Sequence, residues 1–109
     1  MAETENKRRH MNPEDSWKIR KEEAIEYLKT TTDTDAKILY LGDKLSNLKS
    51  IYRDLRVCGD EIWQKFNQKD PKEHKWYYSE IANALSEFKD TYAWKEYNEL
   101  IKLIFNKYC

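Results

Sequence analysis

The sequence predicts an all-α protein, a helical bundle of about four main helices plus a short one. Only two Gly and two Pro occur among the 109 residues, and so few chain breakers leave little room for hairpins. Apolar residues between positions 38 and 55 recur in steps of three and four, a spacing typical of a helix and unsuited to a strand. Aromatic residues make up 14% of the chain, which argues against disorder.

The first helix is expected to begin at Asp15 or Ser16, where a side-chain oxygen can accept hydrogen bonds from the free amides of the first turn. Residues 1–14 are then a polar tail, and residues 15–109 form a single helical domain, as the chain length favours. The apolar face of this first helix is partial, and its members are Trp17, Ile25 and Leu28.

The second helix has the best-defined pattern. The run TTTDTD at 30–35 ends the first helix and supplies an N-cap between Thr32 and Thr34, while Gly59 is a natural stop. Gly42 lies inside this helix, where Gly costs up to about 1 kcal/mol relative to Ala. We therefore expect another group to approach the backbone at Gly42. The inward-facing residues are predicted to be Ile38, Leu41, Leu45, Leu48, Tyr52 and Leu55.

The rest of the chain predicts a short helix over residues 60–66 and two further main helices. One starts after Asp70 as N-cap, with Pro71 at the first helical position. The other follows the Asp-Thr pair at 90–91. The predicted apolar face of the first is Tyr77, Ile81, Leu85 and Phe88, and that of the second is Trp94, Tyr97, Ile101, Ile104 and Phe105.

The charge balance narrows the classes of partner. Lys plus Arg and Asp plus Glu both number 20, which argues against a nucleic-acid-binding or polybasic membrane-binding surface but allows a local basic pocket for a phosphorylated ligand. No apolar run approaches the roughly 20 residues of a membrane span. The polar N-terminus lacks the apolar core of a signal peptide, so we expect a cytoplasmic protein. Cys58 and Cys109 match no zinc-site spacing.

Asp43 is the acidic residue that the helical pattern singles out. It lies on one flank of the apolar stripe, Asn47 follows one turn later, and Asp54 falls nearly in line with both. A carboxylate and an amide stacked on one flank can bind a metal ion with a polar ligand beside it. The alternative is an ordinary solvated face that includes Lys44 and Lys49.

The usual catalytic motifs are missing from the sequence. It contains no Gly-rich phosphate loop, no H-E-x-x-H and no nucleophile elbow. Its two histidines are His10, in the predicted tail, and His74, in the first turn of the helix after Asp70. We expect His74 to be exposed and incidental.

Three segments together resemble HD-domain phosphohydrolases of the RelA/SpoT type, over about residues 10–107. LGDKLSNLKS at 41–50 is similar to the family's helix V-x-x-A-D-[KR]-L-x-N-L-R, with Gly42 in place of Ala. SWKIRKEEAIEYL at 16–28 resembles its W-x-x-R-K helix, and GDEIWQKFNQKDPKEHKWYYSEIANAL at 59–85 resembles a pattern of small bacterial members.

The resemblance implies hydrolysis of guanosine tetraphosphate or a related nucleotide with a divalent metal, usually manganese. In the family an early His, a His-Asp doublet and a later Asp hold that ion, and the later Asp corresponds to Asp43. Asn47 corresponds to a residue that helps to hold the nucleotide. Arg20 and Lys21 match a basic pair near the pocket.

This sequence departs from the family at the other metal ligands. His10 is followed by Met11 and His74 by Lys75, so the chain has no His-Asp doublet, and the early His is missing as well. The resemblance therefore implies the C-terminal half of an HD-like bundle without the family's N-terminal helices. Such a chain is expected to be inactive alone, because one carboxylate cannot hold manganese tightly without further ligands.

A second hypothesis is a non-catalytic helical module for interaction or oligomerisation. The many Trp and Tyr residues favour it, since these rings are enriched at interfaces, although core packing also accounts for them. If the N-terminal helices are missing, helices 16–29 and 36–57 should expose apolar surface, and such a patch would favour homo-oligomers.

Overall fold

The computed structural model describes residues 13–106, with side chains from Ser16 onward, and every element in this range is helical. The all-α prediction is therefore confirmed. The predicted tail lies outside the described residues except for its last two positions, which are already helical. The elements are α2 (Pro13–Thr30), α3 (Thr34–Cys58), the 3₁₀ helix η1 (Gly59–Lys65), α4 (Pro71–Ala84), the 3₁₀ helix η2 (Ser86–Phe88) and α5 (Tyr92–Phe105).

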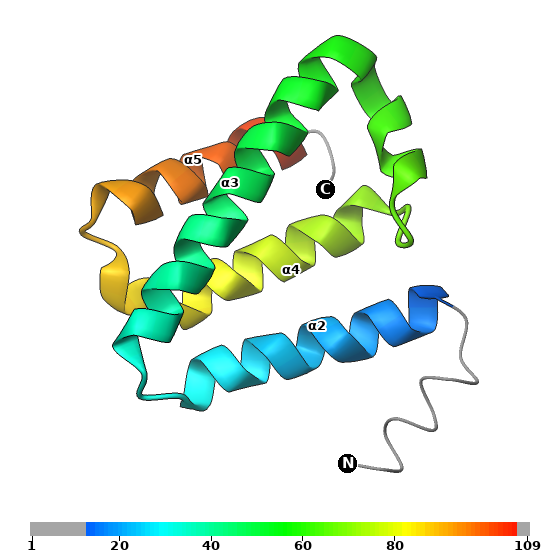
Figure 1. The fold of residues 1–109 in the computed structure, drawn as a ribbon. Coiled ribbons are helices and arrows are strands. Elements are labelled where there is room, and N and C mark those ends of the chain that lie inside the picture. Colours follow the sequence, from blue (N-terminus) through cyan, green and yellow to red (C-terminus); the bar gives the residue numbers. More distant parts are fainter. Residues whose placement is uncertain (1–12, 107–109) are drawn as a thin grey trace.

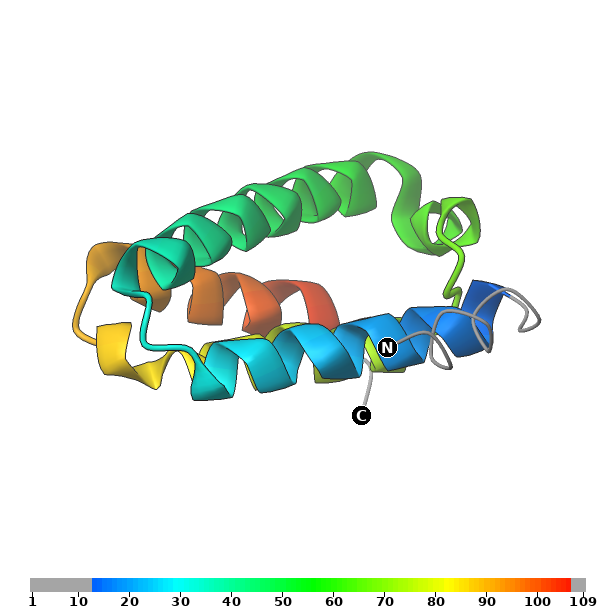
Figure 2. The ribbon, with the colours of Figure 1, turned by 60° about the horizontal axis from the view of Figure 1, so that its bottom comes forward.

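The helices pack both with sequence neighbours and with elements farther along the chain. The main contacts of α2 are with α4, while α5 packs against both α3 and α4. In Figure 1, α2 and α4 run side by side and the long α3 crosses in front of α5. Figure 2 shows α3 in one layer and α2 with α4 in the opposite layer. The helix η1 connects the far end of α3 to the start of α4 (Figure 1).

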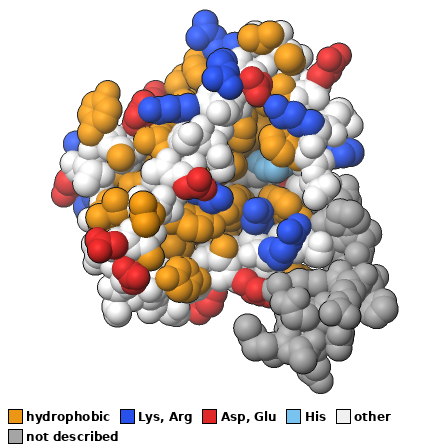
Figure 3. All heavy atoms as spheres, in the orientation of Figure 1, with side chains coloured by type: hydrophobic (Ala, Val, Ile, Leu, Met, Phe, Trp, Pro, Cys, Tyr) orange, Lys and Arg blue, Asp and Glu red, His pale blue; other side chains and the backbone are white. Residues whose placement is uncertain are grey.

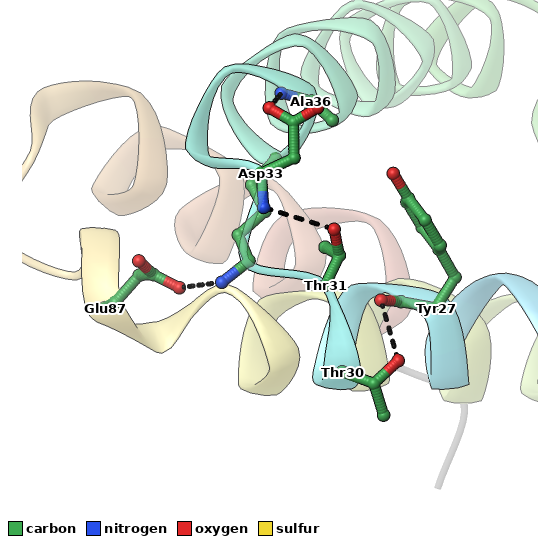
Figure 4. A network of polar contacts seen from close by, with 7 residues as sticks. Tyr27, Thr30, Thr31, Asp33, Ala36 and Glu87 are labelled. Atoms are coloured by element: carbon green, nitrogen blue, oxygen red, sulfur yellow. Dashed lines mark hydrogen bonds and ion pairs between the residues drawn. The ribbon is translucent and has the colours of Figure 1, made fainter.

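The turn from α2 to α3 is fixed by local polar contacts (Figure 4). The Thr30 hydroxyl donates to the Tyr27 carbonyl at 3.4 Å, and the Asp33 amide donates to the Thr31 hydroxyl at 3.2 Å. Asp33 is the N-cap of α3, because its carboxylate accepts the Ala36 amide at 3.1 Å. The cap lies within the predicted 32–34 segment.

The predicted starts of the last two helices are also confirmed. Asp70 caps α4 by accepting the Lys72 amide at 2.9 Å, with Pro71 at the first position. Thr91 caps α5 by accepting the Trp94 amide at 3.2 Å. The helix after Asp70 ends earlier than the predicted apolar face, so that Phe88 belongs to η2 instead.

The core lies where α5 meets α3 and α4, and α2 adds Trp17, Ile25 and Leu28 to it. The Tyr97 hydroxyl, fully buried, donates to the Tyr78 carbonyl at 2.9 Å, and the Trp94 indole donates to the Ala82 carbonyl at 3.0 Å. These bonds satisfy the polar atoms of two large aromatic residues inside the core. The largest fully buried side chains are Tyr97, Phe105, Leu28, Leu48, Ile81, Leu85 and Ile104.

The inward face of α3 agrees with the predicted one except at Ile38, and it also includes Ile51. Leu41 and Leu48 are buried as predicted, but Ile38 is 51% exposed and Ile51 is buried in its place. The predicted residues Leu45, Tyr52 and Leu55 are partly buried and pack against the core.

The two glycines have different roles. Gly59 ends α3 as predicted, with a φ of 68° that favours glycine. The expectation of a close approach at Gly42 is wrong for the described residues, because nothing beyond the helix's own neighbouring backbone lies within 4 Å of a Cβ built there.

Exposed apolar side chains occur on α5 (Tyr92 and Leu103) as well as on the two helices for which they were expected, so the expectation of a surface left by missing helices stays a prediction. Tyr27 on α2 and Ile38, Leu39 and Val57 on α3 are all at least half exposed. Within residues 13–106, no helix combines the length and apolar character needed to cross a membrane.

Candidate anion-binding pocket

His74 is buried, which corrects the expectation that it is exposed. The rings of Trp17, Trp63 and Phe66 surround it, with centroids 5.0–5.3 Å from that of the imidazole. Its Nε2 lies 2.8 Å from the Gln68 carbonyl oxygen, which can only accept, so Nε2 carries the proton. Burial lowers the pKa of His74 despite this hydrogen bond. The imidazole is therefore held neutral as part of an aromatic wall.

This aromatic wall closes one side of a pocket of about 180 Å³ where α2, α3 and α4 meet. In Figure 3 the pale blue side chain is His74, the one described histidine, and blue Lys and Arg side chains lie beside it on the same face. None of the lining residues is acidic: they are Trp17, Lys21, Lys44, Asn47, Phe66, His74, Tyr77 and Tyr78.

Two lysines share this pocket. The Lys21 ammonium lies 4.8 Å from the centre of the Tyr77 ring, and the Lys44 ammonium lies 5.0 Å from that of Tyr40. Burial lowers the pKa of Lys21, and the positive charges of Lys44 and Arg20 lower it further. The Lys44 side chain is itself only 17% exposed. The pocket thus holds two partly desolvated cations that repel each other.

Neutral tyrosines complete the wall. The Tyr40 and Tyr77 hydroxyls are 2.7 Å apart. Burial raises the pKa of Tyr77 far above its ordinary value, and burial raises that of Tyr78 to about 12, although a hydrogen bond with Asn47 acts in the opposite direction. These phenols stay protonated at neutral pH and can donate hydrogen bonds to an anion.

A second pocket of about 260 Å³ adjoins the first, since Asn47, Phe66 and Tyr78 line both. Its far end holds an ion pair in which the Lys65 ammonium donates to the Asp54 carboxylate at 2.9 Å. That contact lowers the pKa of Asp54. The second pocket therefore offers an aromatic ring beside polar groups of both charges.

The sequence-predicted binding residues divide between the pocket and the surface. Lys21 and Asn47 line the first pocket. Arg20 does not line it: its Nε donates to the Ser16 carbonyl at 3.2 Å on the outside of α2. Asp43 is 67% exposed and its carboxylate lies 3.3 Å from the Lys44 ammonium, at the rim.

The donor set around Asp43 does not fit a manganese site. Its near neighbour is the cation of Lys44, and a cation competes with a metal ion for the carboxylate. Among residues 13–106, no three His, Cys, Asp or Glu side chains are grouped so that they could hold a metal. His10 lies outside these residues.

The sequence did not identify Lys44 or His74 as residues of the pocket. Lys44 was assigned to the solvated face of its helix. The signal for Lys44 was available: it lies one turn after Tyr40 on α3 and three residues after Leu41, and therefore close to the buried face. The burial of His74 depends on rings contributed by α2 and η1, which no local pattern reveals.

The chain was compared with family models, with curated proteins and with solved structures, and no match was found in any of the three.

Proposed function

We propose that this protein binds a phosphorylated nucleotide of the guanosine tetraphosphate type in the Lys21–Lys44 pocket and does not hydrolyse it alone. One observation carries the proposal: two partly buried ammonium groups share a pocket whose lining contains no carboxylate. Two such cations raise the free energy of the empty pocket, and a phosphate between them lowers it. The resemblance to HD phosphohydrolases points to the same ligand class.

The polar groups of the pocket match a phosphate. Asn47 offers an amide, Tyr78 a protonated hydroxyl, and the two lysines offer charge-assisted hydrogen bonds, which are the stronger kind. The lysine side of the pocket therefore suits the phosphate groups. The low dielectric of the aromatic wall strengthens each of these contacts.

The adjoining pocket suits a nucleotide base. Phe66 offers a ring for stacking, Ile51 an apolar floor, and Asn47 and Ser50 polar edges. The two pockets together reach the range of roughly 300–1,000 Å³ that is common for small-molecule sites. A ligand with both a phosphate and a base therefore suits the site better than inorganic phosphate.

Hydrolysis is not part of this proposal, because the donor set around Asp43 does not fit a metal centre. The chain is proposed as the nucleotide-holding half of an HD-like domain, located in the cytoplasm, whose hydrolytic ligands come from another polypeptide if they are supplied. No step of a reaction follows from the residues of this chain.

Calorimetric titration with guanosine tetraphosphate at low ionic strength tests the proposal. We expect one site per chain, with an affinity that decreases as salt is raised. Lys21→Gln and Lys44→Gln should each weaken binding about ten-fold or more, since each removes a charge-assisted contact. Lys49→Gln is the matched control on α3, because Lys49 is exposed and pairs with Glu96 outside the pocket.

Equal binding by all three variants, or no heat with the wild-type chain, would overturn the nucleotide proposal. The second hypothesis, a helical interaction module, would then account better for the exposed apolar side chains. Titration of pyrophosphate and of guanosine in parallel separates the contributions of the two pockets.

A further inference from the structure

The outer side of α5 carries a groove that the nucleotide proposal does not use. It has a volume of about 430 Å³, and its lining repeats at helical spacing along α5: Tyr92, Lys95, Glu96, Glu99, Leu100 and Leu103. Tyr92 is 81% exposed and Leu103 is 48% exposed. The strip thus has an apolar side chain near each end and charges between them.

Two of the three charged side chains in the middle of this α5 strip have no ion-pair partner within the described part of the chain. Glu96 pairs with Lys49 of α3, but no ion pair among residues 16–106 involves Lys95 or Glu99. Both are exposed and lie one turn apart on the same side of α5. Lys95 and Glu99 can therefore pair with a partner that presents an acidic side chain opposite Lys95 and a basic one opposite Glu99, which is the reverse order of charges.

A second copy of the same helix presents that reverse order when it runs antiparallel. With a two-fold axis at position 97, Tyr92 of each copy is level with Lys102 of the other and lies one residue, about 1.5 Å along the helix, from Leu103. In the same register Lys95 of each copy faces Glu99 of the other. A parallel pair places Lys95 against Lys95 instead. Two-fold interfaces need such a self-complementary patch, and opposite charges across it fix the register.

We propose that the α5 strip forms a two-fold homodimer in which Lys95 of each copy pairs with Glu99 of the other. Because the formal net charge of the chain is zero, no long-range electrostatic repulsion opposes self-association. Contact along one 14-residue helix is at the small end of specific interfaces, so we expect a reversible dimer with a dissociation constant of about 10 µM to 1 mM. The lysine pocket and the α5 strip have no lining residue in common, so the dimer does not require a ligand in the pocket.

Charge reversal on the full chain tests this proposal. Sedimentation equilibrium at concentrations up to roughly 1 mM should show a monomer–dimer equilibrium. Lys95→Glu alone places four acids at the interface, and Glu99→Lys alone places four bases there, so each should weaken self-association about ten-fold or more. A mixture of the two single variants restores both opposite-charge pairs and should associate. The double variant carrying both changes should also dimerise.

The mixing experiment distinguishes a specific pairing from a general loss of stability, because a variant that fails to fold cannot be rescued by another variant. Leu39→Glu is the matched control, because it tests whether the exposed Leu39 side chain on α3 forms the contact between the two copies instead. A wild-type chain that stays monomeric throughout would overturn the proposal. So would single variants that associate as the wild type does, or association that Leu39→Glu abolishes and Lys95→Glu leaves unchanged.

Discussion

Burial of His74 makes the stability of the fold depend on pH. Its folded-state pKa lies below the ordinary value of 6.5, so between these two values the unfolded chain binds more protons than the folded one. The free energy of unfolding should therefore fall as pH decreases below about 6.5, and this loss should stop once the folded-state pKa is passed.

Chemical denaturation of the wild type and of His74→Gln at pH 7 and pH 5 measures this effect. The variant should lose less stability between the two pH values, although it is less stable at pH 7 because the aromatic packing is disturbed. The same decrease in both proteins would show that carboxylates alone account for the pH dependence.

Asp43 yields a second prediction for a single residue. Its carboxylate is mostly exposed and lies 3.3 Å from the Lys44 ammonium, so it would compete with the proposed phosphate ligand for Lys44. Asp43→Asn should therefore raise the affinity for guanosine tetraphosphate about two- to five-fold and change the free energy of unfolding by less than about 1 kcal/mol. Asp90→Asn is the control for net charge, because it removes the same charge from an exposed residue that is far from Asp43 in the sequence. Weaker binding by Asp43→Asn in calorimetry would instead favour a ligand role for this carboxylate.

Single residues were predicted from the sequence with uneven success. Lys21 and Asn47, which the resemblance to the HD family singled out, both line the pocket, while Arg20 on the outside of α2 does not; their role in nucleotide binding stays a prediction. The manganese role of Asp43 was a prediction from resemblance, and among residues 13–106 no group of His, Cys, Asp or Glu side chains supplies it with further ligands. Burial of a side chain such as His74 depends on residues far away in the sequence, which local spacing does not encode.

At the scale of the helices, the two glycines give a matched pair of predictions. Gly42 lies inside α3 with free space around its Cα, so Gly42→Ala should raise the free energy of unfolding by about 0.5–1 kcal/mol. Gly59 has a φ of 68°, so Gly59→Ala should lower it by about 1 kcal/mol or more. Urea denaturation of both variants provides the comparison, and destabilisation by Gly42→Ala would indicate a contact that the fold does not show.

The helices were the part of the structure that the sequence predicted best. The caps at Asp33, Asp70 and Thr91 fall at predicted positions because each cap depends on residues only two or three apart. The exposure of Ile38 and the burial of Ile51 on α3 were not predictable in the same way. The periodicity of one helix does not specify which neighbours will flank it.

For the molecule as a whole, the bond between Tyr97 and Tyr78 joins α5 to α4 inside the core. Tyr97→Phe keeps the ring and removes this hydrogen bond, so it should lower the free energy of unfolding by about 1 kcal/mol. Tyr27→Phe is the control, because Tyr27 is half exposed and can use water instead. Equal effects in thermal denaturation would mean that the buried bond contributes no more than an exposed hydroxyl.

The packing order of the helices has a consequence for motion. Because α2 has its main contacts with α4 alone, whereas α4 also packs on α5 and α3 packs on both η1 and α5, α2 can detach while the other helices remain assembled. Its amides should then exchange with deuterium through a local opening of lower free energy than global unfolding. Since α2 contributes Trp17 and Lys21 to the pocket, a ligand bound there would slow this exchange along the whole of α2.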